Sequence, residues 1–277
     1  MTKTVVVIGA SSDIAHAATR RWLERGWAVS GTYRTEGARV RELVDAGAAL
    51  QQLDLDDAAA LKQVGARLPA NWDVALLAAA TLEPIGPFET TDIDAWAASV
   101  ELNLVSHART IHALLPTRRR SGSPVIILFA GAGVNDAPVN FSAELVGKLG
   151  LIKLCELLDA ELPDARIVIV GPGWVDTKIH RQTLDAGERA GAALARTREK
   201  LDSGAFVQVG RVIDCLDWII GQPKSVVGGR NISAAHDAWT DARLADKLHQ
   251  TGDMYKLRRR LNDWSPDART PSEVARP

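Results

Sequence analysis

The chain has 277 residues, of which 46% are hydrophobic, enough for one α/β domain with a large core. A formal net charge of −1 and the lack of a long run of one sign argue against a nucleic-acid-binding surface. The two cysteines are too few for a disulfide scaffold and no apolar stretch is long enough to cross a bilayer, so we expect a cytoplasmic protein that binds neither membrane nor nucleic acid.

Short β-branched runs alternate with amphipathic helical stretches, a pattern typical of a parallel sheet with helices on both faces. Strands are predicted over residues 5–8, 28–32, 48–53, 74–77, 125–129, 167–170 and 226–232. Helices are predicted over residues 13–25, 36–46, 57–67, 92–116, 142–162 and 208–220. The sequence therefore predicts an α/β fold of the Rossmann type, with a doubly wound sheet of seven parallel strands.

The chain divides into one domain and a tail. Residues 176–205 carry no strand signal, so we expect a helical flap there, between the sixth strand and the next helix. We expect a dinucleotide-binding domain over residues 1–240 and a C-terminal helical tail over residues 241–277. The tail includes Tyr255, which could reach a site only by folding back, and we expect that it does not.

The first strand leads into a turn of small residues that is followed directly by a helix. Such a turn lets the backbone approach a pyrophosphate, whose charge is favoured by free amide groups and by the helix dipole. The predicted cofactor contacts in this turn are Gly9, Ser11, Ser12, Asp13 and Ile14.

Arg34 follows the second strand, at a place where an NAD-specific site would hold the ribose with a carboxylate. A guanidinium there can bind the 2′-phosphate of NADP through short, charge-assisted hydrogen bonds. NADP(H) is therefore favoured over NAD(H). The alternative is that Arg34 is a solvated loop residue.

Two segments of the second half resemble the short-chain dehydrogenase/reductase family. The run from Phe141 to Lys148 resembles its active-site helix, and the run from Gly171 to Thr177 resembles its nicotinamide-binding element. The similarity covers roughly residues 3–235. It implies an oxidoreductase in which Lys148 bonds the nicotinamide ribose and in which Pro172, Gly173, Val175 and Thr177 hold the nicotinamide carboxamide.

The resemblance assigns further roles along the chain. It implies that Asp54 and Leu55 contact the adenine, although an aspartate capping the next helix is the alternative. It also implies cofactor contacts from Ala78 and Ala79, where the family has Asn-Asn-Ala-Gly. Asn103 matches the asparagine that bends the backbone and holds a water of the proton relay.

Both proton-handling groups of the family are missing. Glu144 stands in place of the proton-donating tyrosine, and Gly131 in place of the substrate-orienting serine. In one interpretation Glu144 is the general acid or base. In a second, Glu144 only positions the substrate, and the proton comes from water or from Asp136, Asn140, Ser142 or His180. In a third, Glu144 and Lys148 form an ordinary helix ion pair, and the protein binds NADP(H) without turnover, as a sensor or partner protein.

The flap and the loop facing it are polar, which favours a polar small-molecule carbonyl or alcohol, such as a sugar or nucleoside, as the substrate. The predicted substrate contacts are Gly131, Asp136, Asn140, His180 and Trp239, although core packing is the alternative for Trp239. We expect no metal, because no second His or Cys lies at ligand spacing from His180. The family similarity, with the Leu-rich helices 92–116 and 142–162, implies a homodimer or homotetramer.

Overall fold

A computed structural model describes residues 2–259 of the chain. Its centre is a seven-stranded sheet, parallel throughout, in the order β3-β2-β1-β4-β5-β6-β7. The strands are β1 (Thr4–Ile8), β2 (Ala28–Tyr33), β3 (Ala49–Gln52), β4 (Val74–Leu77), β5 (Val125–Phe129), β6 (Arg166–Gly171) and β7 (Asn231–Ser233). The order reverses between β1 and β4, where a crevice opens outside the carboxyl ends of the strands. The predicted doubly wound α/β fold is confirmed.

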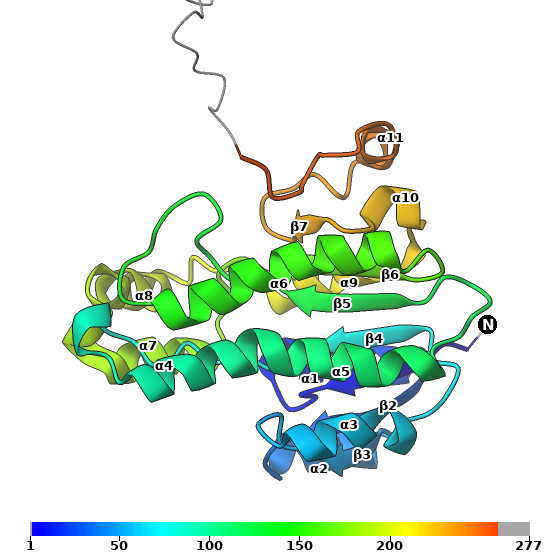
Figure 1. The fold of residues 1–277 in the computed structure, drawn as a ribbon, viewed down its shortest axis with the longest axis horizontal. Coiled ribbons are helices and arrows are strands. Elements are labelled where there is room, and N and C mark those ends of the chain that lie inside the picture. The colour runs from blue at the N-terminus through cyan, green and yellow to red at the C-terminus, as the bar shows by residue number, and fades with distance from the viewer. Residues whose placement is uncertain (1, 260–277) are drawn as a thin grey trace, which may run out of the picture.

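Helices cover both faces of the sheet (Figure 1). One face packs against α1 (Asp13–Glu24), α2 (Ala38–Asp45) and α9 (Val209–Gly221), and the other against α3 (Ala58–Arg67), α5 (Ser106–Leu114) and α6 (Ser142–Glu161). Successive residues of a strand point to opposite faces, so Val5 and Val7 join the first core while Val6 and Ile8 join the second. No helix within residues 2–259 is both long and apolar enough to span a membrane.

The predicted helix 92–116 is interrupted. It consists of α4 (Ile93–Val100), one π-helical turn η2 (Glu101–Val105) and α5, followed by a short 3₁₀ turn.

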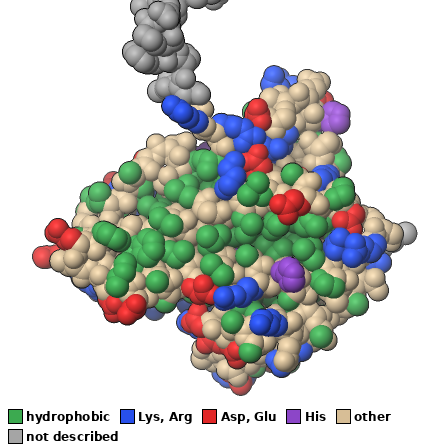
Figure 2. Space-filling model, in the orientation of Figure 1, with side chains coloured by type: hydrophobic (Ala, Val, Ile, Leu, Met, Phe, Trp, Pro, Cys, Tyr) green, Lys and Arg blue, Asp and Glu red, His purple; other side chains and the backbone are tan. Residues whose placement is uncertain are grey.

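The outer surface of α5 and α6 carries many hydrophobic side chains and faces the viewer in Figure 2. Val146 and Leu157 of α6 are about half exposed on the single chain, at 47% and 51%.

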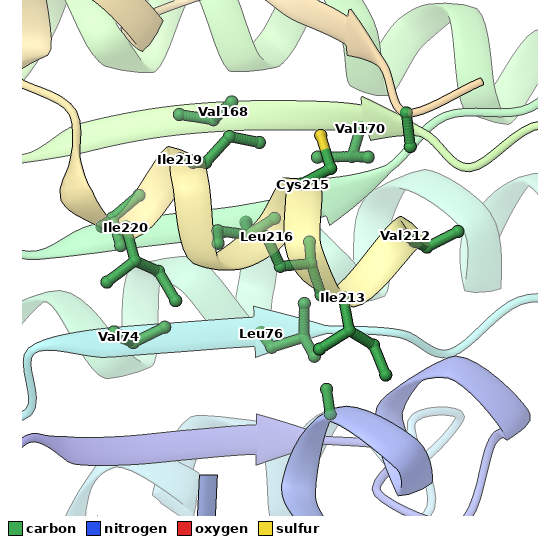
Figure 3. Close-up of a cluster of buried hydrophobic side chains, with 14 of the residues drawn as sticks. Val74, Leu76, Val168, Val170, Val212, Ile213, Cys215, Leu216, Ile219 and Ile220 are labelled. Carbon is green, nitrogen blue, oxygen red and sulfur yellow. The ribbon is translucent and has the colours of Figure 1, made fainter. Parts of the chain in front are cut away.

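Helix α9 shows how a helix is fixed to the sheet. Its apolar residues recur at helical spacing and pack onto the valines and leucine of β4 and β6 (Figure 3). Burying one such side chain contributes about 1.5–3 kcal/mol. The residues of α9 in this contact are Val212, Ile213, Leu216, Ile219 and Ile220.

The predicted seventh strand, residues 226–232, is wrong over its first half. Lys224–Val227 forms the short helix α10, and only Asn231–Ser233 pairs with β6. Lys224 fixes the helix by donating to the carbonyls of Asp159 and Ala165, each at 2.6 Å. Gly228 and Gly229 then turn the chain, the second with φ +67°. A short apolar run does not distinguish a strand from a buried helical turn.

The tail also departs from expectation. Helix α11 covers only Ala242–Gln250, after which the chain folds back along β7. The Tyr255 carbonyl accepts the Asn231 N–H at 2.8 Å. The buried Arg230 guanidinium donates to the Leu248 carbonyl at 2.6 Å and to the Thr251 carbonyl at 3.0 Å. The expectation that Tyr255 stays away from the rest of the fold is therefore wrong, and residues 260–277 of the predicted tail lie outside the described residues.

Residues predicted to form the flap contain two helices. They are α7 (Ile179–Ala186) and α8 (Ala192–Ser203), joined by the 3₁₀ turn η4 (Gly187–Ala190). A small apolar cluster joins the flap to the β4–α4 loop and to the start of α6. It consists of Ile85, Phe141, Leu145, Ala186 and Ala190.

Candidate active site

A cavity of about 1760 Å³ runs along the carboxyl edge of the sheet. Pockets for one small ligand measure about 300–1,000 Å³, so this cavity has room for a dinucleotide and a substrate together. Every residue predicted to bind the cofactor lines it. These are Gly9, Ser11, Ser12, Asp13, Ile14, Arg34, Asp54, Leu55, Ala78, Ala79, Lys148, Pro172, Gly173, Val175 and Thr177.

The turn after β1 is shaped so that a ligand can approach its backbone closely. Gly9 has φ +79°, and a Cβ there would lie 3.2 Å from the Ala79 backbone nitrogen. The N–H groups of Gly9 and Ala10 donate hydrogen bonds to the Thr32 carbonyl, at 3.1 and 2.8 Å. Ser12 immediately precedes α1, and its buried Oγ has no hydrogen-bond partner within the described part of the chain. The turn thus offers a helix N-terminus and a spare hydroxyl to an anion.

Asp13 ties this turn to the flap. Its carboxylate pairs with Arg39 at 2.6 Å and accepts the Lys178 N–H at 2.9 Å. Burial raises the pKa of Asp13, but the bonds from Arg39 and Lys178 outweigh it and hold the pKa below its usual value. The Arg39 guanidinium also reaches the Ser11 carbonyl at 3.5 Å. Sequence reasoning missed Arg39, because no turn motif extends to α2.

Asn103 holds the loop after β4 in place from the side that faces away from the cavity. Its Nδ2 donates to the Thr81 carbonyl at 2.9 Å, and its Oδ1 accepts the Thr81 N–H at 3.3 Å. Gly147 of α6 packs against it, since a Cβ at Gly147 would lie 2.8 Å from the Asn103 Cβ. Asn103 is fully buried in the π-helical turn and lies behind the residues that line the cavity.

His107 is a second buried residue that lies behind the cavity lining, and sequence reasoning missed it. The side chain lies on α5 with its Nδ1 at 3.0 Å from the Leu102 carbonyl oxygen. Burial, together with the Lys148 charge, lowers the pKa of His107 to about 3, so the ring is neutral. Nothing in the residue spacing of α5 indicates that this histidine is buried behind the site.

Glu144 and Lys148 lie side by side on α6 at the cavity wall. The two residues are only 6% and 4% exposed, unlike an ordinary helix ion pair. The Lys148 Nζ donates to the Phe129 carbonyl at 3.1 Å. Burial raises the pKa of Glu144 to about 7, against the opposing charge of Lys148. Burial also lowers the pKa of Lys148, against the opposing charge of Glu144.

Gly131 and Glu144 share one space. A Cβ built at Gly131 would lie 2.4 Å from Glu144 Oε1 and 3.0 Å from Lys148 Cγ. The carboxyl therefore fills the volume that a side chain at position 131 would need. A side chain at position 131 would fit only if this carboxyl moved aside.

The flap is closed over the substrate end of the cavity. Gln182 accepts the Leu82 N–H at 2.9 Å and donates to Thr81 Oγ1 at 3.2 Å. Asn140 Nδ2 donates to the Arg189 carbonyl at 2.9 Å. These bonds tie α7 and η4 to the loops on either side.

Three of the predicted substrate residues, Gly131, Asp136 and His180, line the cavity. His180 stacks on Trp174 with ring centroids 4.0 Å apart, and burial lowers its pKa, against opposing contributions from Val175 and Asp176. The other two, Asn140 and Trp239, are not among the described residues of the lining. Asn140 holds the flap, and Trp239 is buried with its Nε1 donating to the Ala234 carbonyl at 3.1 Å.

The folded-back tail closes the far edge of the cavity. Tyr255, Lys256, Leu257 and Arg258 line it. The Tyr255 hydroxyl bonds to Asp237, and burial, together with the Asp237 charge, raises the pKa of this tyrosine. Tyr255 is therefore not an activated proton donor that replaces the missing tyrosine.

The chain is similar in sequence to known proteins over most of its length. The sequence profile of the family described as enoyl-(acyl carrier protein) reductase matches residues 9–233. Cis-4-hydroxycyclohexanecarboxylate dehydrogenase of Sinomonas cyclohexanicum is 28% identical, over 82% of this chain and 96% of its own.

Solved structures show the same fold. A short-chain dehydrogenase/reductase of Saccharomyces cerevisiae superposes with a TM-score of 0.74 at 21% identity, covering 88% of this chain and 98% of its own. An actinorhodin polyketide ketoreductase solved with NADPH superposes with a TM-score of 0.73 at 22% identity, covering 84% of this chain and 95% of its own.

Proposed function

This chain belongs to the short-chain dehydrogenase/reductase family of oxidoreductases, which use nicotinamide cofactors, and on that premise we propose that it reduces the carbonyl group of a polar small molecule with NADPH. Glu144 is the proton donor in this proposal. The observation that carries it is a buried carboxyl on the cavity wall whose pKa is raised to about 7. A relative that is 28% identical is named for dehydrogenation of a hydroxyl on a cyclohexanecarboxylate ring, a polar small molecule.

The residues present fit a dinucleotide. The N-terminus of α1 and the spare Ser12 Oγ suit a pyrophosphate, and the left-handed backbone of Gly9 keeps side-chain atoms out of its path. Lys148 lies where a nicotinamide ribose would meet α6. Pro172, Gly173, Val175 and Thr177 would hold the carboxamide end.

Preference for the phosphorylated cofactor rests on Arg34, one of two arginines near the turn. Arg34 lines the cavity after β2, and Arg39 lies beside the first turn. Planar guanidinium groups form paired, charge-assisted bonds with phosphate oxygens. Arg39 already holds Asp13, so we assign the 2′-phosphate to Arg34 and the orientation of the turn to Arg39.

NADPH, when bound, supplies the hydride that the carbonyl carbon accepts. The protonated Glu144 carboxyl donates its proton to the carbonyl oxygen as negative charge develops there, and it regains a proton from solvent after the alcohol leaves. The Lys148 ammonium, fixed by the Phe129 carbonyl, stabilises the carboxylate that forms. Asn103 and His107 hold the backbone behind the site and keep this geometry.

Glu144→Gln and Lys148→Ala test the assignment. We expect Glu144→Gln to lower kcat for NADPH oxidation with a panel of ketones by about 100-fold or more, the usual size of a general-acid contribution, while calorimetric NADPH affinity stays unchanged. Lys148→Ala should weaken both turnover and NADPH binding. Undiminished oxidation in both variants would show that Glu144 is not the acid.

The same assays separate an enzyme from a sensor. If the unmodified protein binds NADPH tightly but oxidises it with no ketone or aldehyde in the panel, the proposal of catalysis fails and a non-catalytic NADP(H)-binding protein of this fold is the conclusion. Lys148→Ala would then change affinity only.

A further inference from the structure

Helix α8 turns one face toward the cavity. Ala193, Arg196, Thr197 and Lys200 all line it, at the i, i+3, i+4 and i+7 spacing that places residues on one side of a helix. Thr197 is buried at 4% exposure, which confirms that this side faces inward. Arg198 is exposed and, unlike the exposed Arg196, is not among the described residues that line the cavity.

The two cations of this face have no carboxylate partner. Within residues 2–259, neither Arg196 nor Lys200 takes part in an ion pair, and Lys200 Nζ lies 5.8 Å above the Trp174 ring and 3.3 Å from the Ala205 carbonyl. By contrast, Arg258 at the other rim is neutralised by Glu156 and Asp253, each at 2.7 Å. The inner face of α8 thus presents uncompensated positive charge to the cavity.

This face belongs to the Glu144 end of the cavity. Ala193 and Leu194 of α8 pack against the apolar cluster that includes Phe141 and Leu145, the second of which directly follows Glu144 in α6. The cofactor turn lies beside Asp13, which already has its own cation in Arg39. Asp136 also lines the cavity, but within residues 2–259 it forms no ion pair with Arg196 or Lys200.

We propose that the substrate carries an anionic group, a carboxylate or a sulfonate, which Arg196 and Lys200 bind while its carbonyl lies at Glu144. This inference rests on the proposed function and adds the substrate class to it. The guanidinium of Arg196 matches the two oxygens of such a group with parallel hydrogen bonds, and Lys200 adds a point charge one helical turn away. Arg196 is thereby a residue that determines specificity.

The test compares matched substrates. Acetoacetate and levulinate, each beside its methyl ester, and an oxoalkanesulfonate beside its parent ketone, are assayed with NADPH. We expect kcat/KM for the acids to exceed that for the esters by at least about tenfold, the effect of one charge-assisted bond. Arg196→Gln should remove most of this preference, by raising KM for the acids far more than KM for the esters.

Arg198→Gln is the control, because it removes the same charge from the outer side of the same helix. Acid affinity of the NADPH complex is also measured by calorimetry, so that a chain without turnover still reports on binding. Equal activity with acids and esters, or an unchanged acid preference in Arg196→Gln, would overturn the inference while leaving ketone reduction intact. A loss of NADPH affinity in Arg196→Gln alone would assign Arg196 to the cofactor phosphates and also overturn it.

Discussion

At the scale of single residues, the site depends on what burial does to one carboxyl group. A glutamate on a helix surface near a lysine is ionised at neutral pH, because water and the cation both favour the charge. Inside the cavity wall the cost of desolvation exceeds the attraction of Lys148, and the pKa of Glu144 rises to about 7. General acid–base catalysis is most efficient when the pKa of the catalytic group lies near the operating pH, and the pKa of Glu144 meets this condition at neutral pH.

The pH dependence of catalysis follows from this pKa. For ketone reduction the protonated acid is the active form, so kcat should be constant well below pH 7 and fall about tenfold per pH unit above it. Alcohol oxidation needs the carboxylate, and its rate should rise through the same pH. Stopped-flow NADPH oxidation and NADP reduction over about pH 5–9 measure both. A profile without this inflection, or the same inflection in Glu144→Gln, would contradict the assignment.

The shared space of Gly131 and Glu144 gives a second prediction. Gly131→Ala should lower kcat by displacing the Glu144 carboxyl, and it should destabilise the protein by no more than ~1 kcal/mol, the low end of the usual cost of overpacking, because the atom in conflict ends a flexible side chain. The φ angle of Gly131 is not in the left-handed region, so strain of the backbone does not contribute. Denaturant unfolding and steady-state kinetics measure the two effects.

Two further variants serve as controls for this prediction. In a Glu144→Ala background the stability cost of Gly131→Ala should become smaller, because the shortest contact, to Glu144 Oε1, is gone and only the contact to Lys148 Cγ remains. Gly210→Ala, with nothing within 4 Å of the added Cβ, should cause no loss of stability. An equal cost of Gly131→Ala in both backgrounds would show that the two positions do not compete.

At the scale of elements, the alternation of strands and helices was enough to predict the sheet and its topology class. The family resemblance pointed to most of the candidate cofactor residues, which line one cavity. Periodicity failed at Val226 and Val227, where a four-residue helix anchored by Lys224 resembles a strand in sequence. Nothing in the sequence indicated that the tail folds back onto β7. This contact depends on hydrogen bonds from Arg230 to backbone carbonyls within residues 248–254, and backbone carbonyls carry no sequence signal. Arg39 and His107 act through contacts distant in sequence, which spacing cannot reveal.

The closed flap gives a prediction at this scale. Gln182→Ala removes the two bonds that tie α7 to the loop after β4. Each such bond contributes about 0.5–1.5 kcal/mol, so we expect substrate KM to rise several-fold and amide exchange in α7 to quicken. NADPH affinity should change little. Gln63→Ala, which removes a bond within α3, is the control, and unchanged exchange in α7 would disprove the role of Gln182.

At the scale of the whole molecule, the notable surface is the outer side of α4 to α6. Ile93, Val146 and Leu157 are exposed there at 60%, 47% and 51%, and Figure 2 shows hydrophobic side chains gathered over this face. Contiguous apolar surface on a folded domain marks an interaction site. We propose that two copies of the chain meet through this face, as the sequence resemblance implied, in a homodimer or a homotetramer.

Val146→Glu tests this association. A buried, unpaired carboxylate at the centre of the contact should weaken it by at least about tenfold in dissociation constant, measured by sedimentation equilibrium. Val44→Glu on α2, a residue of similar exposure at 48%, is the matched control. A monomeric unmodified protein, or equal association of both variants, would remove the proposed contact.

The packing of Glu144 against Gly131 also links what can be changed at these two positions. A serine introduced at position 131 would place its Cβ 2.4 Å from Glu144 Oε1 and 3.0 Å from Lys148 Cγ, so the carboxyl end of the glutamate would have to turn away before the new side chain fits. Adding a serine alone would therefore move the acid from the position that it holds here. An attempt to re-engineer this site has to treat positions 131 and 144 as one unit.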